Sequence, residues 1–184
     1  MNEVLEVIKR RRSVRKYKAE QISGEALEKI LEAAVYAPSA NNRQPWHFTV
    51  IQDAQLLNNI NNVTRRNMEK SDEEWVRKTG SNPGFRVTYD APALIVVSGR
   101  KDVMTAKVDC SAAIQNILVA AESMNIGSVW LGLVRYFFQD EEELSALKIP
   151  EGYEPFYGVA LGYNANEESL PAPKRNMEVI NYIR

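Results

Sequence analysis

A continuous run of apolar residues, Ala93-Leu94-Ile95-Val96-Val97, places the strongest constraint on how this chain folds. A run of strand length without polar alternation predicts a strand that is covered on both faces. Such a strand belongs in the middle of a sheet. The run is also much shorter than the roughly 20 residues that a membrane-spanning helix requires, so we expect no membrane-spanning segment and no membrane partner.

Helices and strands are interspersed along the rest of the chain. Apolar residues recur at helical spacing over 3–11, 27–35 and 105–125, and after Asp53, a candidate N-cap. Ser23 is the candidate N-cap of the second of these helices, and Pro38 ends it. Capping boxes predict short helices at 71–74 and 140–143, and β-rich patterns predict strands over 46–51, 128–134 and 156–163. With no repeat or linker, residues 1–184 are predicted to form a single domain that mixes helices and strands.

Two polar segments stand apart from this pattern. Residues 67–90 contain Gly80, Pro83 and Gly84 and are predicted to form a mobile flap. Residues 164–184 form a tail in which Pro171 and Pro173 exclude helix at the start, while residues 179–183 have the composition of an edge strand.

Composition excludes several function classes. The 184 residues include 23 Lys and Arg against 24 Asp and Glu, and a net charge of -1 argues against a nucleic-acid partner. Cys110 is the single cysteine, so an internal disulfide and a two-cysteine zinc clip are both excluded. The single histidine, His47, lacks the partners of a nucleophilic triad and is interpreted as structural, and we predict no metal. The lone cysteine and an N-terminus without signal-peptide character predict a cytoplasmic protein.

The segment Lys9-Arg10-Arg11-Arg12-Ser13-Val14-Arg15-Lys16 is strongly basic. Arginine offers forked donors to two phosphate oxygens and serine adds another donor, so this composition suits a small phosphate ligand. A solvated basic face and a nucleic-acid patch are the alternatives that composition alone leaves open.

A second polar segment lies between a predicted helix and a predicted strand. It is Ala37-Pro38-Ser39-Ala40-Asn41-Asn42-Arg43-Gln44-Pro45-Trp46. Its neutral donors and acceptors suit the rim of a heteroaromatic ring that carries alternating carbonyls and ring nitrogens. An ordinary helix-to-strand connector is the alternative, because Asn, Ser and Pro are common in loops.

These two segments together resemble the FMN-dependent nitroreductase family. The resemblance continues in order through residues 91–97, the long helix leading to 127–132, residues 161–163 and the tail at 173–175 and 179–180. It implies an α+β fold in which a small mixed, mostly antiparallel sheet is flanked by helices. It also implies a homodimer with the long helix at its interface, two FMN molecules in that interface, and a C-terminal tail that extends onto the partner subunit.

The resemblance assigns cofactor-binding roles to particular residues. Arg11, Arg12 and Ser13 would hold phosphate and ribityl oxygens together with Lys174 or Arg175, and Arg15 would approach the N1/O2 edge of the flavin. Leu131 and Gly132 would pass beside the ring, with the Gly132 N–H near N5. The partner subunit would contribute residues from the second polar segment: Pro38, Ser39, Ala40, Asn42 and Gln44.

One stretch departs from the family pattern. Many members carry an Asn and a Lys near the flavin just before the central strand, whereas this chain has Pro83-Gly84-Phe85-Arg86-Val87. Arg86 is the candidate for the second cation.

The implied activity is transfer of hydride from NAD(P)H, through flavin N5, to a small electron-poor acceptor such as a nitroaromatic or a quinone. The flavin carries this chemistry, so no side chain is predicted to be a catalytic acid or base. Reductive dehalogenation or a flavin-consuming reaction on the same fold is one alternative, and a non-catalytic FMN-binding or redox-sensing protein is another.

Overall fold

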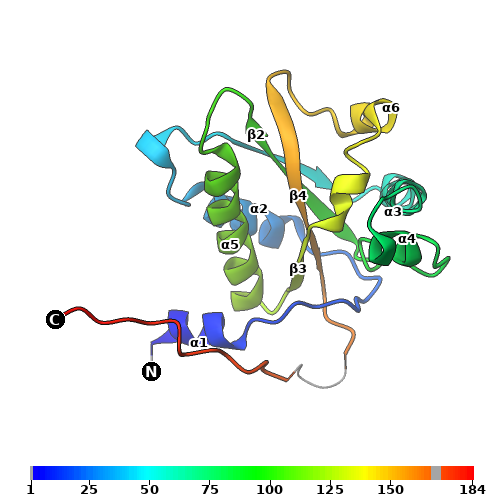
Figure 1. The fold of residues 1–184 in the computed structure, drawn as a ribbon. Coiled ribbons are helices and arrows are strands. Elements are labelled where there is room, and N and C mark those ends of the chain that lie inside the picture. The colour runs from blue at the N-terminus through cyan, green and yellow to red at the C-terminus, as the bar shows by residue number, and fades with distance from the viewer. Residues whose placement is uncertain (1, 167–170) are drawn as a thin grey trace.

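The computed structural model describes residues 2–166 and 171–184 and contains a four-stranded sheet (Figure 1). The strands are β1 (Trp46–Ile51), β2 (Ala93–Arg100), β3 (Gly127–Leu131) and β4 (Tyr153–Gly162), in the order β1-β2-β4-β3. Every neighbouring pair in this sheet is antiparallel. The apolar run of residues 93–97 lies in β2, between β1 and β4, and all five residues are fully buried. The prediction of a strand in the middle of the sheet is confirmed.

Helices cover both faces of the sheet (Figure 1). The α-helices are α1 (Glu3–Arg10), α2 (Gly24–Val35), α3 (Ala54–Met68), α4 (Glu74–Gly80), α5 (Ala106–Ser123) and α6 (Glu141–Leu144). Three 3-10 turns are η1 (Ala40–Asn42), η2 (Leu133–Tyr136) and η3 (Ser145–Leu147). The α+β class and the long helix near 105–125 are confirmed.

Side chains of β2 alternate between two hydrophobic cores. Ile95 and Val97 pack with residues of α2 and α5, including Ile114, while Leu94 and Val96 pack with α3 residues such as Ile60. A different set of helices covers each face of β2 and excludes water from it. Side chains on both faces of this strand must therefore be apolar, which requires a continuous apolar run.

Capping side chains set where several helices begin. Ser23, Asp53 and Asp140 accept hydrogen bonds from backbone N–H groups in the first turns of α2, α3 and α6, as predicted. The capping box predicted at 71–74 is wrong. Helix α4 begins at Glu74 with Glu73 as its N-cap, because the Ser71 hydroxyl instead accepts from the Glu73 N–H just before the helix.

Two predicted strands differ from the structure. The strand predicted over 128–134 ends at Leu131, because the chain turns at Gly132 into η2 and buries Val134 in the core beneath. Residues 179–183 form no strand, since the tail runs past α1 and away from the sheet (Figure 1). Its apolar side chains are exposed in the single chain; Ile183 is 95% exposed.

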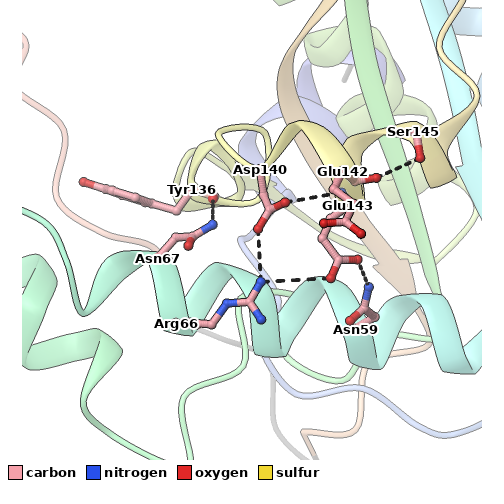
Figure 2. A network of polar contacts seen from close by, with 8 residues as sticks. All are labelled: Asn59, Arg66, Asn67, Tyr136, Asp140, Glu142, Glu143 and Ser145. Atoms are coloured by element: carbon pink, nitrogen blue, oxygen red, sulfur yellow. Dashed lines mark hydrogen bonds and ion pairs between the residues drawn. The ribbon is translucent and has the colours of Figure 1, made fainter.

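Polar contacts attach the segment after β3 to helix α3 (Figure 2). The Asn67 side-chain amide donates to the Tyr136 carbonyl over 2.9 Å, and Arg66 pairs with Asp140 at 3.0 Å. Asn59 donates to the carboxylate of Glu143. These contacts fix η2 and α6 on α3 and so hold the exit of β3 in place.

Across residues 2–166 and 171–184, no helix combines the length and the apolar character needed to cross a membrane.

Candidate functional site

A basic pocket forms where the N-terminal segment meets the tail. It has a volume of about 560 Å³. Residues from both ends of the chain line it: Arg11, Arg12, Ser13, Arg15, Lys16, Asn166, Pro171, Pro173 and Arg175. The sequence segment singled out for phosphate binding therefore forms one wall of a concave site.

The backbone of this segment is fixed between β3 and the end of β4. Val14 N–H donates to the Ser128 carbonyl over 3.0 Å, and Lys18 N–H donates to the Tyr163 carbonyl over 2.9 Å. The Lys16 carbonyl in turn accepts from Ala165 N–H at 3.0 Å. Val14 is buried, so its neighbours Ser13 and Arg15 point to the other side of the extended segment.

Four cations of the pocket are without a carboxylate partner in the part of the chain that the structure describes. Among the described residues, no carboxylate pairs with Arg11, Arg15, Lys16 or Arg175. Arg12 donates to the carbonyls of Lys9 and Pro171 and so joins the N-terminal segment to the tail. Cationic side chains that gather in a concave site without a carboxylate partner are arranged to bind an anion.

Tyr17 supports this wall from inside. Its hydroxyl donates to the Val14 carbonyl over 2.7 Å, and burial raises the pKa of that hydroxyl well above its usual range. Tyr17 is therefore a neutral structural donor, and the charge of the wall comes from the arginines and Lys16.

The loop between α2 and β1 is strained. Asn41, Asn42 and Gln44 have φ angles of 51°, 54° and 45°, in the left-handed region that residues other than glycine rarely adopt. Gln44 N–H donates to the Ser39 hydroxyl over 3.0 Å, and the Gln44 side-chain amide donates to Asn42 at the same distance. Such strain persists where surrounding contacts impose it, and it concentrates at functional sites.

Asp109 is the anchor of this loop. It lies at the start of α5, is 6% exposed, and accepts hydrogen bonds from Ala40 N–H at 3.4 Å and from the Thr105 hydroxyl at 2.9 Å. Sequence reasoning missed this residue. The available signal was a carboxylate between Val108 and Cys110, on a helix with a wide apolar face.

The loop that contains η1 and the basic segment that follows α1 lie near opposite ends of α5 (Figure 1). Asp109 holds the loop, while Glu122 pairs with Arg10 at 2.8 Å beside the basic segment. With a rise of about 1.5 Å per residue, these two carboxylates are about 20 Å apart along the helix axis. One chain therefore does not bring the two polar segments into one site.

The nitroreductase family model matches residues 8–163 of this chain. The chain belongs to the nitroreductase family. A protein of Archaeoglobus fulgidus, provisionally named an NADH dehydrogenase/NAD(P)H nitroreductase, is 38% identical over an alignment of 180 positions that covers 92% of this chain and 90% of that protein.

Two solved structures are similar over the full length of both chains. A nitroreductase with bound FMN from Bacteroides fragilis is 36% identical, with a TM-score of 0.93. A nitroreductase with bound FMN from Desulfitobacterium hafniense is 32% identical, with a TM-score of 0.90. This extent of similarity confirms the resemblance in fold that the sequence motifs indicated.

The nitroreductase fold places the predicted site residues in three groups. The basic pocket gathers Arg11, Arg12, Ser13, Arg15 and Arg175, whereas Lys174 is not among the residues that line it. The loop near the start of α5 holds Pro38, Ser39, Ala40, Asn42 and Gln44.

The third group is Leu131 and Gly132 at the exit of β3. Leu131 is buried, and Gly132 is exposed, with no atom within 4 Å of the position that a Cβ would take. The backbone of Gly132 is therefore accessible, as close approach to a planar ring requires.

Arg86, the candidate second cation, is not among the residues that line the basic pocket. Its Nε donates to Asp90 over 2.9 Å and its Nη2 donates to Asn58 of α3 over 2.8 Å. Tyr89, two residues after the stretch at 83–87, does reach the basic segment: the Arg15 guanidinium carbon lies 5.8 Å from the centre of its ring. Sequence reasoning did not identify Tyr89.

Proposed function

We propose that this chain is an FMN-dependent oxidoreductase that uses NAD(P)H to reduce a small electron-poor acceptor such as a nitroaromatic or a quinone. The observation that carries the proposal is the basic pocket of a nitroreductase-family fold, which gathers three arginines of the N-terminal segment, Lys16, Ser13 and Arg175 of the tail around one concave site. Its donors fit a phosphate group. Bound FMN would supply the hydride-transfer chemistry.

The residues of the pocket divide into two roles. Arg11, Arg12, Ser13 and Arg175 would hold the phosphate and the ribityl oxygens, with Arg175 favoured over Lys174 because it lines the pocket. Arg15, which is further along the same wall, would place its positive charge beside the N1/O2 edge of the flavin.

We further propose that the active unit is a homodimer. The two halves of the site lie about 20 Å apart along α5, so antiparallel packing of two α5 helices would join the loop of one chain to the basic pocket of the other. Exposed apolar residues support such an interface. They lie on α1, around the ends of α2 and α5, and in the tail: Val4, Leu5, Ile8, Val35, Tyr36, Met104, Val108, Val179, Ile180, Tyr182 and Ile183.

Two further expectations belong to the same proposal. Residues 67–90 would lie over the site, held by Met68, Val76 and Thr88, which are fully buried. Residues 164–184 would wrap onto the partner, and the protein would act in the cytoplasm without a nucleic-acid partner.

The decisive experiment is an absorption spectrum of the purified protein, followed by release and mass identification of any chromophore. We expect one FMN per chain, and NAD(P)H oxidation that is stimulated by a nitroaromatic or a quinone. Replacing Ser13 and Arg15 with Ala should remove the flavin, whereas the exposed Lys29→Ala control should retain it.

Other outcomes would separate the alternatives. A colourless protein that also refuses added FMN contradicts the proposal. Bound FMN without acceptor-dependent NAD(P)H oxidation favours a binding or redox-sensing protein. If sedimentation shows a dimer, the tail variants Ile180→Asp and Ile183→Asp should weaken it, while Lys78→Asp on the exposed surface of α4 should not.

A further inference from the structure

We propose that Tyr89 is a positioning residue of the flavin site, whose ring orients the Arg15 guanidinium, and that the buried pair Asn61 and Thr88 holds Tyr89 in place. This inference rests on the proposed function, in which Arg15 lies beside the flavin. Residues 88 and 89, just before β2, would then influence the cofactor through Arg15. Arg86 does not fill this role, because it is held by Asp90 and Asn58.

The pair formed by Asn61 and Thr88 is a closed polar contact within the core. Asn61 of α3 is 2% exposed and Thr88 is fully buried. Thr88 N–H donates to Asn61 Oδ1 over 3.0 Å, and Asn61 Nδ2 donates to the Thr88 hydroxyl over 2.8 Å and to the Leu57 carbonyl over 2.9 Å. Since buried polar groups with complete hydrogen bonding are rigid, the pair fixes the chain at residue 88.

The next two residues adopt an unfavourable backbone conformation. Tyr89 and Asp90 both have a φ of 54°, which is uncommon for residues with a Cβ and particularly so for a bulky one. The Arg86 side chain donates a hydrogen bond to Asp90 and another to Asn58 of α3. Helix α3 thus holds Thr88 through Asn61 and Asp90 through Arg86, and these contacts impose the strained conformation at residues 89 and 90.

This backbone conformation directs the Tyr89 ring toward the basic segment. The Arg15 guanidinium lies over this ring at 5.8 Å, a cation–π distance. The hydrogen bond that the Arg15 guanidinium donates to the Ser13 carbonyl is long, at 3.5 Å. Arginine has many rotamers, so a ring that restricts the guanidinium prepares it for a ligand and lowers the entropy lost on binding.

The test measures FMN dissociation constants and flavin midpoint potentials in the holoprotein for substitutions at position 89. Tyr89→Asn is the informative variant, because asparagine tolerates the left-handed conformation but has no aromatic face. We expect FMN affinity to fall about 3- to 10-fold, as loss of a partly shielded cation–π contact implies, and the potential to become more negative. Tyr89→Phe, which keeps the ring, should restore both. The control Tyr153→Asn removes a ring that packs on His47, far along the sheet, and should change neither.

A double-mutant cycle with Arg15→Ala shows whether Tyr89 acts through Arg15. In the Arg15→Ala background, Tyr89→Asn should have no further effect on affinity or potential. An equal effect in both backgrounds, or no effect in the wild-type background, overturns the proposal. If Arg15→Ala itself changes neither quantity, the site assignment under the proposed function fails as well, so the two failures are distinguishable.

The role of the buried pair is tested at position 88. Thr88→Val removes the hydroxyl at nearly constant volume and should weaken FMN binding in the same direction as Tyr89→Asn, while Thr88→Ser should restore it. Tyr89→Asn keeps this pair intact, so the role of Tyr89 itself is still tested if Thr88→Val fails to fold. A Thr88→Val protein that folds with wild-type affinity and potential would remove Asn61 and Thr88 from the proposal.

Discussion

Val14 packs directly against Gly127: three carbons of the Val14 side chain lie 3.0 Å from the position that a Cβ on Gly127 would occupy. The adjacent residue Ser128 accepts the backbone hydrogen bond from Val14. The absence of a side chain at Gly127 therefore determines how closely the basic segment approaches β3.

Gly127→Ala is expected to displace the basic segment. The new methyl group meets a buried side chain, and overpacking of this kind costs about 1–3 kcal/mol. Urea unfolding should show this loss, and FMN titration should show weaker binding. Gly24→Ala is the matched control, because a Cβ there meets no atom within 4 Å. If the two variants behave alike, the contact does not set the position of the segment.

Asp109→Ala is expected to release the strained loop. Ala40 N–H and the Thr105 hydroxyl both lose their acceptor, which costs about 1–3 kcal/mol for each donor that stays buried. We expect lower stability in urea and weaker FMN binding. Asp109→Asn keeps an acceptor oxygen and should recover most of both. Asp102→Ala removes an exposed carboxylate and serves as the control.

Asn67→Ala tests the attachment of η2 to α3 that Figure 2 shows. Its side chain bonds the Tyr136 carbonyl at 2.9 Å, so its loss should lower the free energy of unfolding by about 1 kcal/mol. Asn62→Ala, at an exposed position on the same helix, should leave stability nearly unchanged. Equal unfolding midpoints for the two variants would contradict the role given to this contact.

Cys110 is expected to be unreactive in the folded protein. Burial, and secondarily the nearby Asp109, raises the pKa of its thiol to about 12. Alkylation by iodoacetamide at pH 8 should therefore be slow until denaturant is added.

The raised pKa of Cys110 also predicts a pH dependence of stability. The folded state holds the proton more tightly than the unfolded state, whose thiol titrates near pH 8.5. The stability that this contributes is complete below that pH and is lost as the pH rises toward 12. Between pH 8 and 10.5, the wild type should lose about 2–3 kcal/mol more than Cys110→Ala in urea unfolding. Parallel losses in both proteins would contradict the shift.

Much of the fold could be predicted from local patterns. The run at 93–97 had to be covered on both faces, and the caps Ser23, Asp53 and Asp140 fixed where three helices begin. Val134 misled the strand prediction because an apolar residue fits a strand and a buried 3-10 turn equally well.

The candidate site could be predicted only where residues close in sequence act together. The segment containing Arg11, Arg12 and Ser13 is of this kind, and the structure places it in a pocket. Asp109 and Tyr89 are not, because their roles depend on Ala40 and Arg15, which are distant along the chain. The strain at Asn41 and Tyr89 likewise depends on contacts that no local pattern encodes.

The basic pocket also has a consequence for how the protein matures. One wall comes from residues 11–16 and the other from a stretch that includes Pro171 and Arg175. Strand β4, the neighbour of both β2 and β3, ends at Gly162, shortly before Arg175 in the chain. Because β4 contributes Val159, Ala160 and Leu161 to the two hydrophobic cores, the cores and the second wall of the pocket depend on the same late part of the chain, and the anion pocket would form only once β4 has joined the sheet.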